Sequence, residues 1–148
     1  MNLQLWLPCL YAFFACLGFS IIFEVHRFRF ILAASLTGTI SWLVYLGSAG
    51  IGSEVGRYFL ATLVVATLSE ILARVFKAPA TIFLIVGIIP LVPGGGLYDT
   101  MDELLNGNTE QFLRTGMRTA AYAGAIAVGC SLISSVVRIL TYQERVKK

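Results

Sequence analysis

The sequence predicts an all-α integral membrane protein, a helical bundle of about five transmembrane helices whose fourth helix is broken by proline and glycine. Of the 148 residues, 57% are hydrophobic and 13% are charged, whereas an average soluble domain is about 25% charged. The apolar residues form runs close to the roughly 20 residues that cross a bilayer. The charges stand mostly at the ends of these runs. This arrangement is expected where lipid, rather than water, surrounds the apolar surface.

The apolar runs predict a single transmembrane domain over residues 1–148. The first run lacks the basic n-region of a signal peptide and continues to Phe23, so we expect it to be a retained span. The last helix should begin near Glu110, ahead of its membrane portion. The expected spans are Leu3–Phe23, Phe30–Leu46, Tyr58–Phe76, Ala80–Val92 and Thr119–Leu140.

The fourth run is too short for an ordinary span. From Ala80 to Val92, at about 1.5 Å per residue, a helix is only about 20 Å long, and the hydrocarbon core is about 30 Å thick. Pro90 and Pro93 interrupt the backbone hydrogen bonds there. We expect the helix to resume at Leu97, after the three glycines 94–96. The segment could cross the membrane fully or be re-entrant.

The placement of lysine and arginine predicts the orientation. With five spans and the N-terminus outside, eight basic residues lie inside and three lie outside. The most acidic loop also falls outside, and a re-entrant fourth segment would move the C-terminal basic cluster outside. The count favours five spans with a cytoplasmic C-terminus. The inside set is Arg27, Arg29, Arg74, Lys77, Arg138, Arg145, Lys147 and Lys148, and the outside set is Arg57, Arg114 and Arg118.

The proline–glycine break is the candidate substrate site. A broken helix leaves backbone groups unpaired, which a membrane tolerates only where protein or a water-filled cavity surrounds them. Transporters use such breaks to place N–H and C=O groups at substrate sites, and a helix N-terminus favours an anion such as a carboxylate. A helix stop followed by an outer turn is the alternative. The candidate pathway residues are Pro90, Pro93, Gly94, Gly95, Gly96, Tyr98 and Thr100.

Two carboxylates are candidates for proton coupling. Glu70 is the acidic residue that lies well inside a span, and intramembrane charges are costly enough to suggest function. It could instead form a structural pair with Arg74, four residues on. Asp99 could carry a proton or bind a ligand, and it could equally cap the short helix that follows the glycines.

Several other functions have little support in the sequence. Cys9, Cys16 and Cys130 lie in apolar runs, without the spacing of a disulfide framework or a metal site. His26 has no Ser, Cys or Asp constellation nearby in the sequence, so we expect no catalytic residue, metal or cofactor. No basic face with interleaved aromatic residues predicts nucleic-acid binding. The basic residues Arg114 and Arg118 could attract anions or form a solvated charge ladder.

Small residues recur every four positions on several helices, as in membrane helices that pack closely. Five helices cannot bury all these faces, so we expect a membrane partner, although packing within the chain accounts for part of the pattern. The stripes are Ala12, Cys16 and Ser20; Ala33, Thr37 and Ser41, with Ala34 and Gly38 beside them; Thr62 and Ala66; Ala121, Ala125 and Gly129; and Ala123, Ala127, Ser131 and Ser135.

The chain resembles the C-terminal half of the threonine/serine exporter family, and in particular the small subunit of its two-gene form. The residues that carry the resemblance are Ile89-Pro90-x-x-Pro93-Gly94 and Tyr98-x-Thr100-Met101. The resemblance implies an exporter of threonine, serine or small dicarboxylates such as succinate, driven by the proton motive force. It also implies a bacterial inner-membrane location and a larger multi-span partner subunit. A non-conducting assembly subunit is the alternative.

Overall fold

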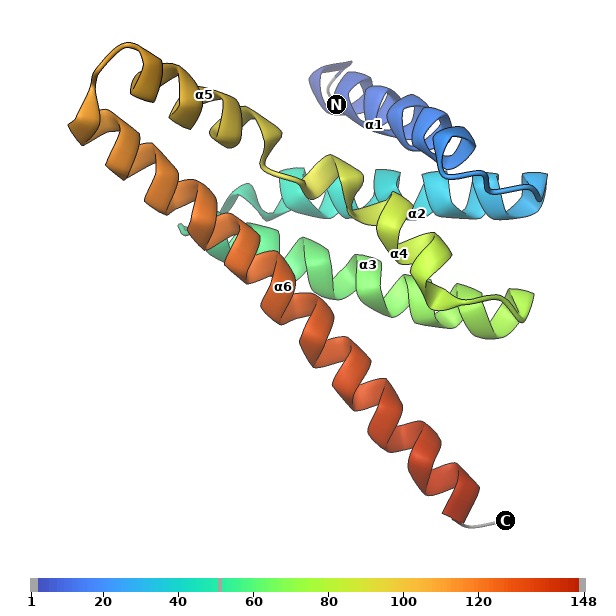
Figure 1. The fold of residues 1–148 in the computed structure, drawn as a ribbon. Helices are drawn as coiled ribbons and strands as arrows, with labels where there is room; N and C mark the ends of the chain where they lie inside the picture. Colours follow the sequence, from blue (N-terminus) through green and yellow to red (C-terminus); the bar gives the residue numbers. More distant parts are fainter. Residues whose placement is uncertain (1–2, 51, 147–148) are drawn as a thin grey trace.

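The described part of the chain folds into six α-helices and two short 3₁₀ helices (Figure 1). The computed structural model describes the backbone of residues 3–50 and 52–146, and the side chains of residues 6–50 and 52–142. Within these ranges it contains no strand. In chain order the elements are α1 (Leu3–Ile22), α2 (Phe28–Gly47), η1 (Ser48–Gly50), α3 (Glu54–Phe76), α4 (Ala80–Ile88), η2 (Ile89–Leu91), α5 (Gly94–Leu105) and α6 (Thr109–Val146).

The predicted all-α membrane architecture is confirmed. Three of the described helices are long and apolar enough to cross a membrane, namely Phe28–Gly50, Glu54–Phe76 and Thr109–Tyr142. The pair formed by Ala80–Leu91 and Gly94–Leu105, which is bent by 50°, makes a fourth if it counts as one broken span. The described part of α1, Trp6–Ile22, is apolar and shorter. A fifth span therefore remains a prediction.

The start of α5 differs from the sequence prediction. We expected the helix to resume at Leu97, but it begins at Gly94, so all three glycines belong to its first turn. Leu97 already donates its N–H to the carbonyl of Pro93, at 3.1 Å. The helix α5 ends at Leu105, and Gly107 takes a positive φ of 75° in the turn before α6.

The helices approach one another closely where small residues meet. Cys16, on the stripe of α1, lies so near Gly38 of α2 that a Cβ built on this glycine would be 2.4 Å from the sulfur. A Cβ on Gly87 of α4 would be 2.6 Å from a methyl carbon of Val65 on α3. Such contacts hold α4 against α1, α2 and α3. They confirm that much of the small-residue pattern packs within the chain.

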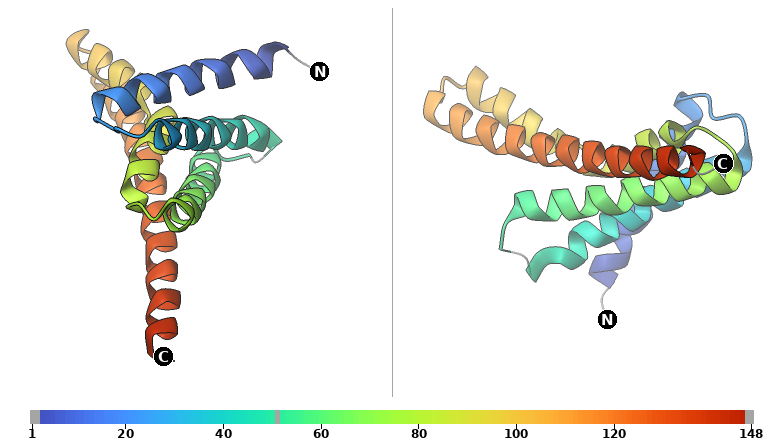
Figure 2. Two further views of the ribbon diagram at one scale, coloured as in Figure 1. Left: turned by 90° about the vertical axis from the view of Figure 1, so that its right-hand side faces the viewer. Right: turned by 90° about the horizontal axis from the view of Figure 1, so that it is seen from below.

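Helices α1, α2 and α3 lie in successive layers, and α6 crosses them along one side (Figure 2). Helix α6 runs in the same direction as α3 and crosses it at an angle (Figure 1). Arg118 pairs with Glu54, the first residue of α3, and Thr141 accepts a hydrogen bond from Arg74 in the last turn of α3. The first turns of α6 extend past the start of α3 and form a projecting hairpin with α5 (Figure 1).

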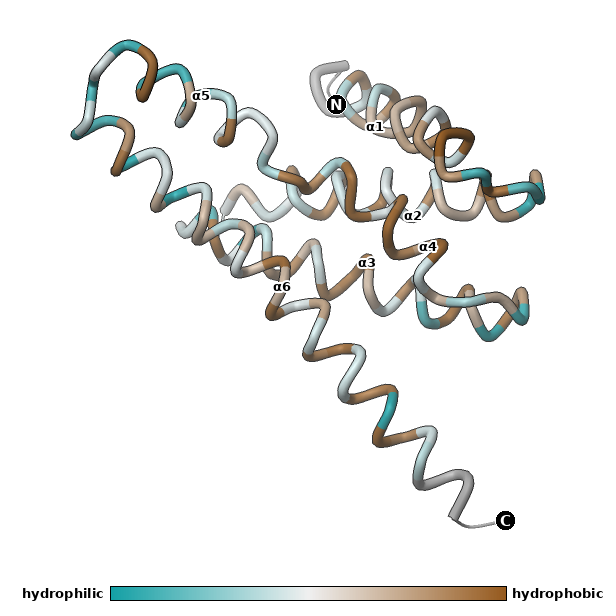
Figure 3. The backbone as a smooth tube through the Cα atoms, in the orientation of Figure 1, coloured by the Kyte–Doolittle hydropathy of each residue, from teal (hydrophilic) through white to brown (hydrophobic). Residues whose placement is uncertain are grey.

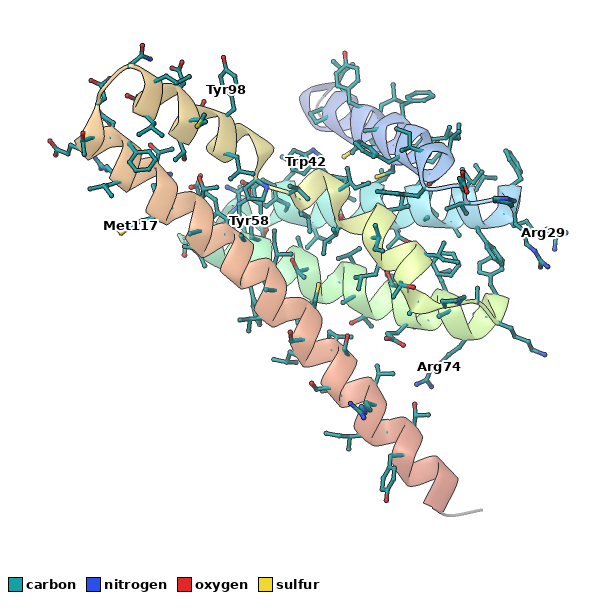
Figure 4. The ribbon with its side chains drawn as sticks, in the orientation of Figure 1. Arg29, Trp42, Tyr58, Arg74, Tyr98 and Met117 are labelled. Carbon is teal, nitrogen blue, oxygen red and sulfur yellow. The ribbon has the colours of Figure 1, made fainter. Side chains whose placement is uncertain are left out.

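Polar residues gather at the two ends of the bundle, and the middle is apolar (Figure 3). One end carries Arg29 and Arg74, both exposed and seen at the same end in Figure 4. The other end carries Glu54 and the α5–α6 hairpin. This distribution is what a bundle needs when its middle lies in hydrocarbon.

Candidate functional site at the broken helix

The break between α4 and α5 is stabilised by side chains from two neighbouring helices. Pro90 has no N–H, so the carbonyl of Val86, four residues earlier, loses its ordinary α-helical donor. This oxygen instead accepts from the N–H of Ile89 and from the thiol of Cys16 on α1, the latter at 3.4 Å. The next carbonyl, that of Gly87, lies 3.1 Å from the hydroxyl of Ser41 on α2, which shares its one hydrogen between this oxygen and the carbonyl of Gly38 at 2.8 Å. Neighbouring side chains thus satisfy the exposed carbonyls, as a broken membrane helix requires.

On the other side of the break, the start of α5 presents free N–H groups. The N–H of Gly94 bonds to the carbonyl of Val92 at 2.7 Å. The N–H groups of Gly95 and Gly96 donate to no acceptor in the part of the chain that the structure describes. They lie in the first turn of a helix, where the backbone dipoles favour negative charge.

The three glycines differ in their surroundings. A Cβ built on Gly96 would be 2.5 Å from the hydroxyl oxygen of the buried Thr119 on α6, so this position requires glycine for close packing. Cβ atoms on Gly94 and Gly95 would meet nothing within 4 Å. Among the described glycines only Gly107 has a positive φ. Gly94 and Gly95 therefore need glycine neither for a left-handed conformation nor for close packing, and they leave open space beside the helix start.

A cavity of about 340 Å³ lies beside the break, between α1, α2 and η2. Its lining is largely apolar. Pro90 faces it from η2, and Trp42 faces it from α2. The lining residues are Pro8, Tyr11, Ala12, Ala15, Trp42 and Pro90.

The two polar residues of α5 named from the sequence lie differently. Tyr98 is 73% exposed and points away from α6 (Figure 4). Thr100 is half-buried against Gly116 of α6, and its hydroxyl donates to the carbonyl of Gly96 at 2.6 Å. The Thr100 hydroxyl is therefore engaged by the helix itself, whereas the Tyr98 hydroxyl is open to a ligand or lipid.

The two candidate carboxylates are far from each other. Glu70 is half-buried on α3 and forms no ion pair with Arg74 among the described side chains, because Arg74 is directed to Thr141. The structural pair of Glu70 with Arg74, which was the alternative interpretation, does not form among the described side chains. Asp99 is exposed in the middle of α5 and caps nothing, since the helix starts five residues earlier. Glu70 is 16 residues beyond Glu54 on α3, or about 24 Å, whereas Asp99 lies on the projecting hairpin.

A polar cluster at the Glu54 end of the bundle was not expected from the sequence. A single carboxylate oxygen of Glu54 accepts from Arg118, at 2.9 Å, and from the hydroxyl of Tyr122. Tyr122 stacks on Tyr58, with ring centroids 4.7 Å apart, and Tyr58 contacts Tyr45 at the same spacing. Arg118 is therefore not part of a simple solvated ladder. The i, i+4 spacing of Arg114 and Arg118 indicates only that they are neighbours on one helix. It could not predict that Arg118 binds Glu54, which lies 64 residues away in the sequence.

Comparison with known families identifies the chain. Residues 8–136 match the family described as Threonine/Serine exporter, ThrE. The chain belongs to the threonine/serine exporter family. Comparisons with curated proteins and with solved structures gave no match. The matched region contains α4, η2 and α5, so the broken helix is part of what the chain shares with this exporter family. Membership makes it an exporter-type, multi-pass membrane protein acting on small molecules.

Proposed function

We propose that this chain is the membrane subunit of a secondary exporter for threonine and serine, or for small dicarboxylates such as succinate, driven by the proton motive force. The observation that carries the proposal is the break at Pro90 and Pro93. Cys16 and Ser41 hold its carbonyls, while the N–H groups of the following glycines remain free. A helix break built in this way supplies hydrogen bonds to a polar solute at membrane depth.

The free N–H groups of Gly95 and Gly96 would bind the carboxylate that these substrates share. Gly94 and Gly95 leave room for it, since no protein atom lies within 4 Å of where their Cβ atoms would be. Pro90 and Pro93 fix the break, Tyr98 offers a hydroxyl nearby in sequence, and Thr100 supports the site by packing. The last of these residues, Gly96, allows α5 to pack closely against α6.

Glu70 is the proposed proton carrier. It is half-buried in the last third of the apolar helix α3 and has no ion pair among the described side chains. A carboxylate in such a place can exchange a proton during a transport cycle without breaking a structural contact. Asp99 is the second candidate, at the end of the bundle where Glu54 lies.

A larger multi-span subunit of the same family is the proposed partner. One face of α6 is exposed although it combines small and apolar residues, a composition suited to close helix contact in lipid. This face is formed by Ala127, Val128, Ser131, Leu132, Ser135 and Val136. We place the complex in the bacterial inner membrane, with the N-terminus outside and the C-terminus in the cytoplasm.

One observation favours a different role. The cavity beside Pro90 has a largely apolar lining, which suits a lipid chain or a partner side chain better than an amino acid. A subunit that conducts nothing and stabilises a transporting partner would need such a surface. In that case the break would be a docking feature rather than part of the pathway.

Efflux of amino acids and dicarboxylates from loaded cells separates the two functions. Cells would produce the chain alone, its partner alone, or both, with membrane abundance measured in parallel. The proposal predicts efflux that requires both chains and falls when the break is altered at constant abundance. Efflux by the partner alone, unchanged by this chain, would refute a conducting role.

A further inference from the structure

A second cavity, lined by charged and apolar residues, lies at the Glu54 end of the bundle, beside the stretch of α6 where Thr119 packs on Gly96. It has a volume of about 630 Å³ and lies between the start of α3 and the first half of α6. Glu54 lines it from α3, and Arg114, Arg118 and Tyr122 line it from successive turns of α6. The remaining lining, from Gly52, Val55, Met117 and Ala121, is small or apolar.

The cavity places charges of both signs around one space. Glu54 uses only one carboxylate oxygen for its bonds to Arg118 and Tyr122, so its other oxygen has no partner among the described residues. Arg118 uses one terminal nitrogen for both Glu54 and Tyr122. Arg114 lies one turn earlier on the same helix, and its side chain has no hydrogen-bond acceptor among the described residues. The cavity therefore has a free anionic acceptor and several free cationic donors.

We propose that this cavity is a binding site for a zwitterionic α-amino acid at the outer mouth of the exporter. The substrate carboxylate would bind Arg114 and the free N–H groups of Arg118, and its ammonium group would bind the free oxygen of Glu54. The short side chain would lie against Val55 and Ala121. This inference rests on the proposed export of amino acids and adds a second site at the end where the substrate leaves.

The charges of the cavity explain why an amino acid fits better than a dicarboxylate. A second carboxylate in place of the ammonium group would face Glu54, and like charges in contact repel. The Glu54–Arg118 pair is also easily exchanged, because its side chains are 47% and 63% exposed. Exposed ion pairs contribute little stability, so a ligand can compete with this pair at low cost.

Two charge-neutralising variants and three ligands test the site. The full chain in lipid nanodiscs would be titrated with L-threonine, with 3-hydroxybutyrate, which lacks the ammonium group, and with L-threoninol, which lacks the carboxylate. We expect Glu54→Gln to weaken L-threonine binding about tenfold or more, because the acceptor of the ammonium group loses its negative charge. Binding of 3-hydroxybutyrate should not weaken. Arg114→Gln should weaken both carboxylates and leave L-threoninol unchanged.

The controls keep folding and function separate from binding. Arg29→Gln removes an exposed arginine at the opposite end and should leave all affinities unchanged. Arg114→Gln breaks no contact among the described residues, so it stays informative even if Glu54→Gln loosens α3 from α6. Unchanged affinities in both variants, in a wild type that exports threonine, would overturn the site and leave the proposed function standing. A wild type that exports nothing even together with its partner subunit would refute the function, yet affinities that follow the two charges would still support the site.

Discussion

Gly87 is the position at which one added methyl group should most directly test the packing of the broken helix. A Cβ at Gly87 would be 2.6 Å from a methyl carbon of Val65 and 3.1 Å from that of Thr37. Carbon atoms in contact prefer about 3.5–4.0 Å, so the closer pair overlaps by about 1 Å. Both neighbours are buried and β-branched, and the Thr37 hydroxyl is bonded to the carbonyl of Ala33. Neither side chain can rotate away freely.

The magnitude follows from a matched control. Overpacking a core by one methyl group costs about 1–3 kcal/mol, and replacing glycine with alanine inside a helix gains up to about 1 kcal/mol. A Cβ at Gly18 of α1 meets nothing within 4 Å, so Gly18→Ala should give the gain without the clash. We expect Gly87→Ala to be less stable than Gly18→Ala by about 1–3 kcal/mol.

The assay is reversible unfolding in mixed micelles, followed by circular dichroism as the fraction of denaturing detergent rises. The difference in unfolding free energy between the two alanine variants gives the cost of overpacking, because both variants carry the same change in helix propensity. Equal unfolding free energies for Gly87→Ala and Gly18→Ala would refute the close approach of α4 to α2 and α3.

Three further predictions test other parts of the structure. Ser41→Ala removes the hydroxyl that bonds to the carbonyl of Gly87, and we expect a loss of about 0.5–1.5 kcal/mol in the same unfolding assay, whereas the exposed Ser134→Ala should have no effect. Glu70→Gln should reduce the pH dependence of efflux at constant abundance, and an unchanged pH profile would make Glu70 a structural residue. A reporter fused after Lys148 should be active only in the cytoplasm, and activity confined to the outer side would reverse the orientation.

The sequence predicted the membrane class and most helix positions because apolar length is a strong physical constraint. The hydrocarbon core supplies no water to hydrogen-bond the backbone, so each span must be a helix that is long enough to cross it. The helices α2, α3 and α6 cover the expected spans for this reason. The small-residue stripes also predicted which faces pack, as Cys16 and Ser41 are fully buried.

Features that depend on contacts between distant segments could not be predicted in the same way. Glycines have low helix propensity, so the start of α5 at Gly94 was missed; packing of Gly96 on Thr119 favours the helix there. Cys16 was expected only to pack, and its bond to Val86 depends on α1 lying beside the break. The pairing of Arg118 with Glu54 likewise depends on how α6 crosses α3.

The central claim is that substrate passes the open side of the break, and Gly95→Val tests it most directly. A Cβ at this position meets no protein atom within 4 Å, so valine should be tolerated by the fold and should obstruct only a solute. Gly18→Val, which also enters open space, controls for effects of valine on membrane insertion. We predict that threonine and serine efflux falls strongly in Gly95→Val and not in Gly18→Val, with both proteins at wild-type abundance. Wild-type efflux from Gly95→Val at wild-type abundance would contradict the claim.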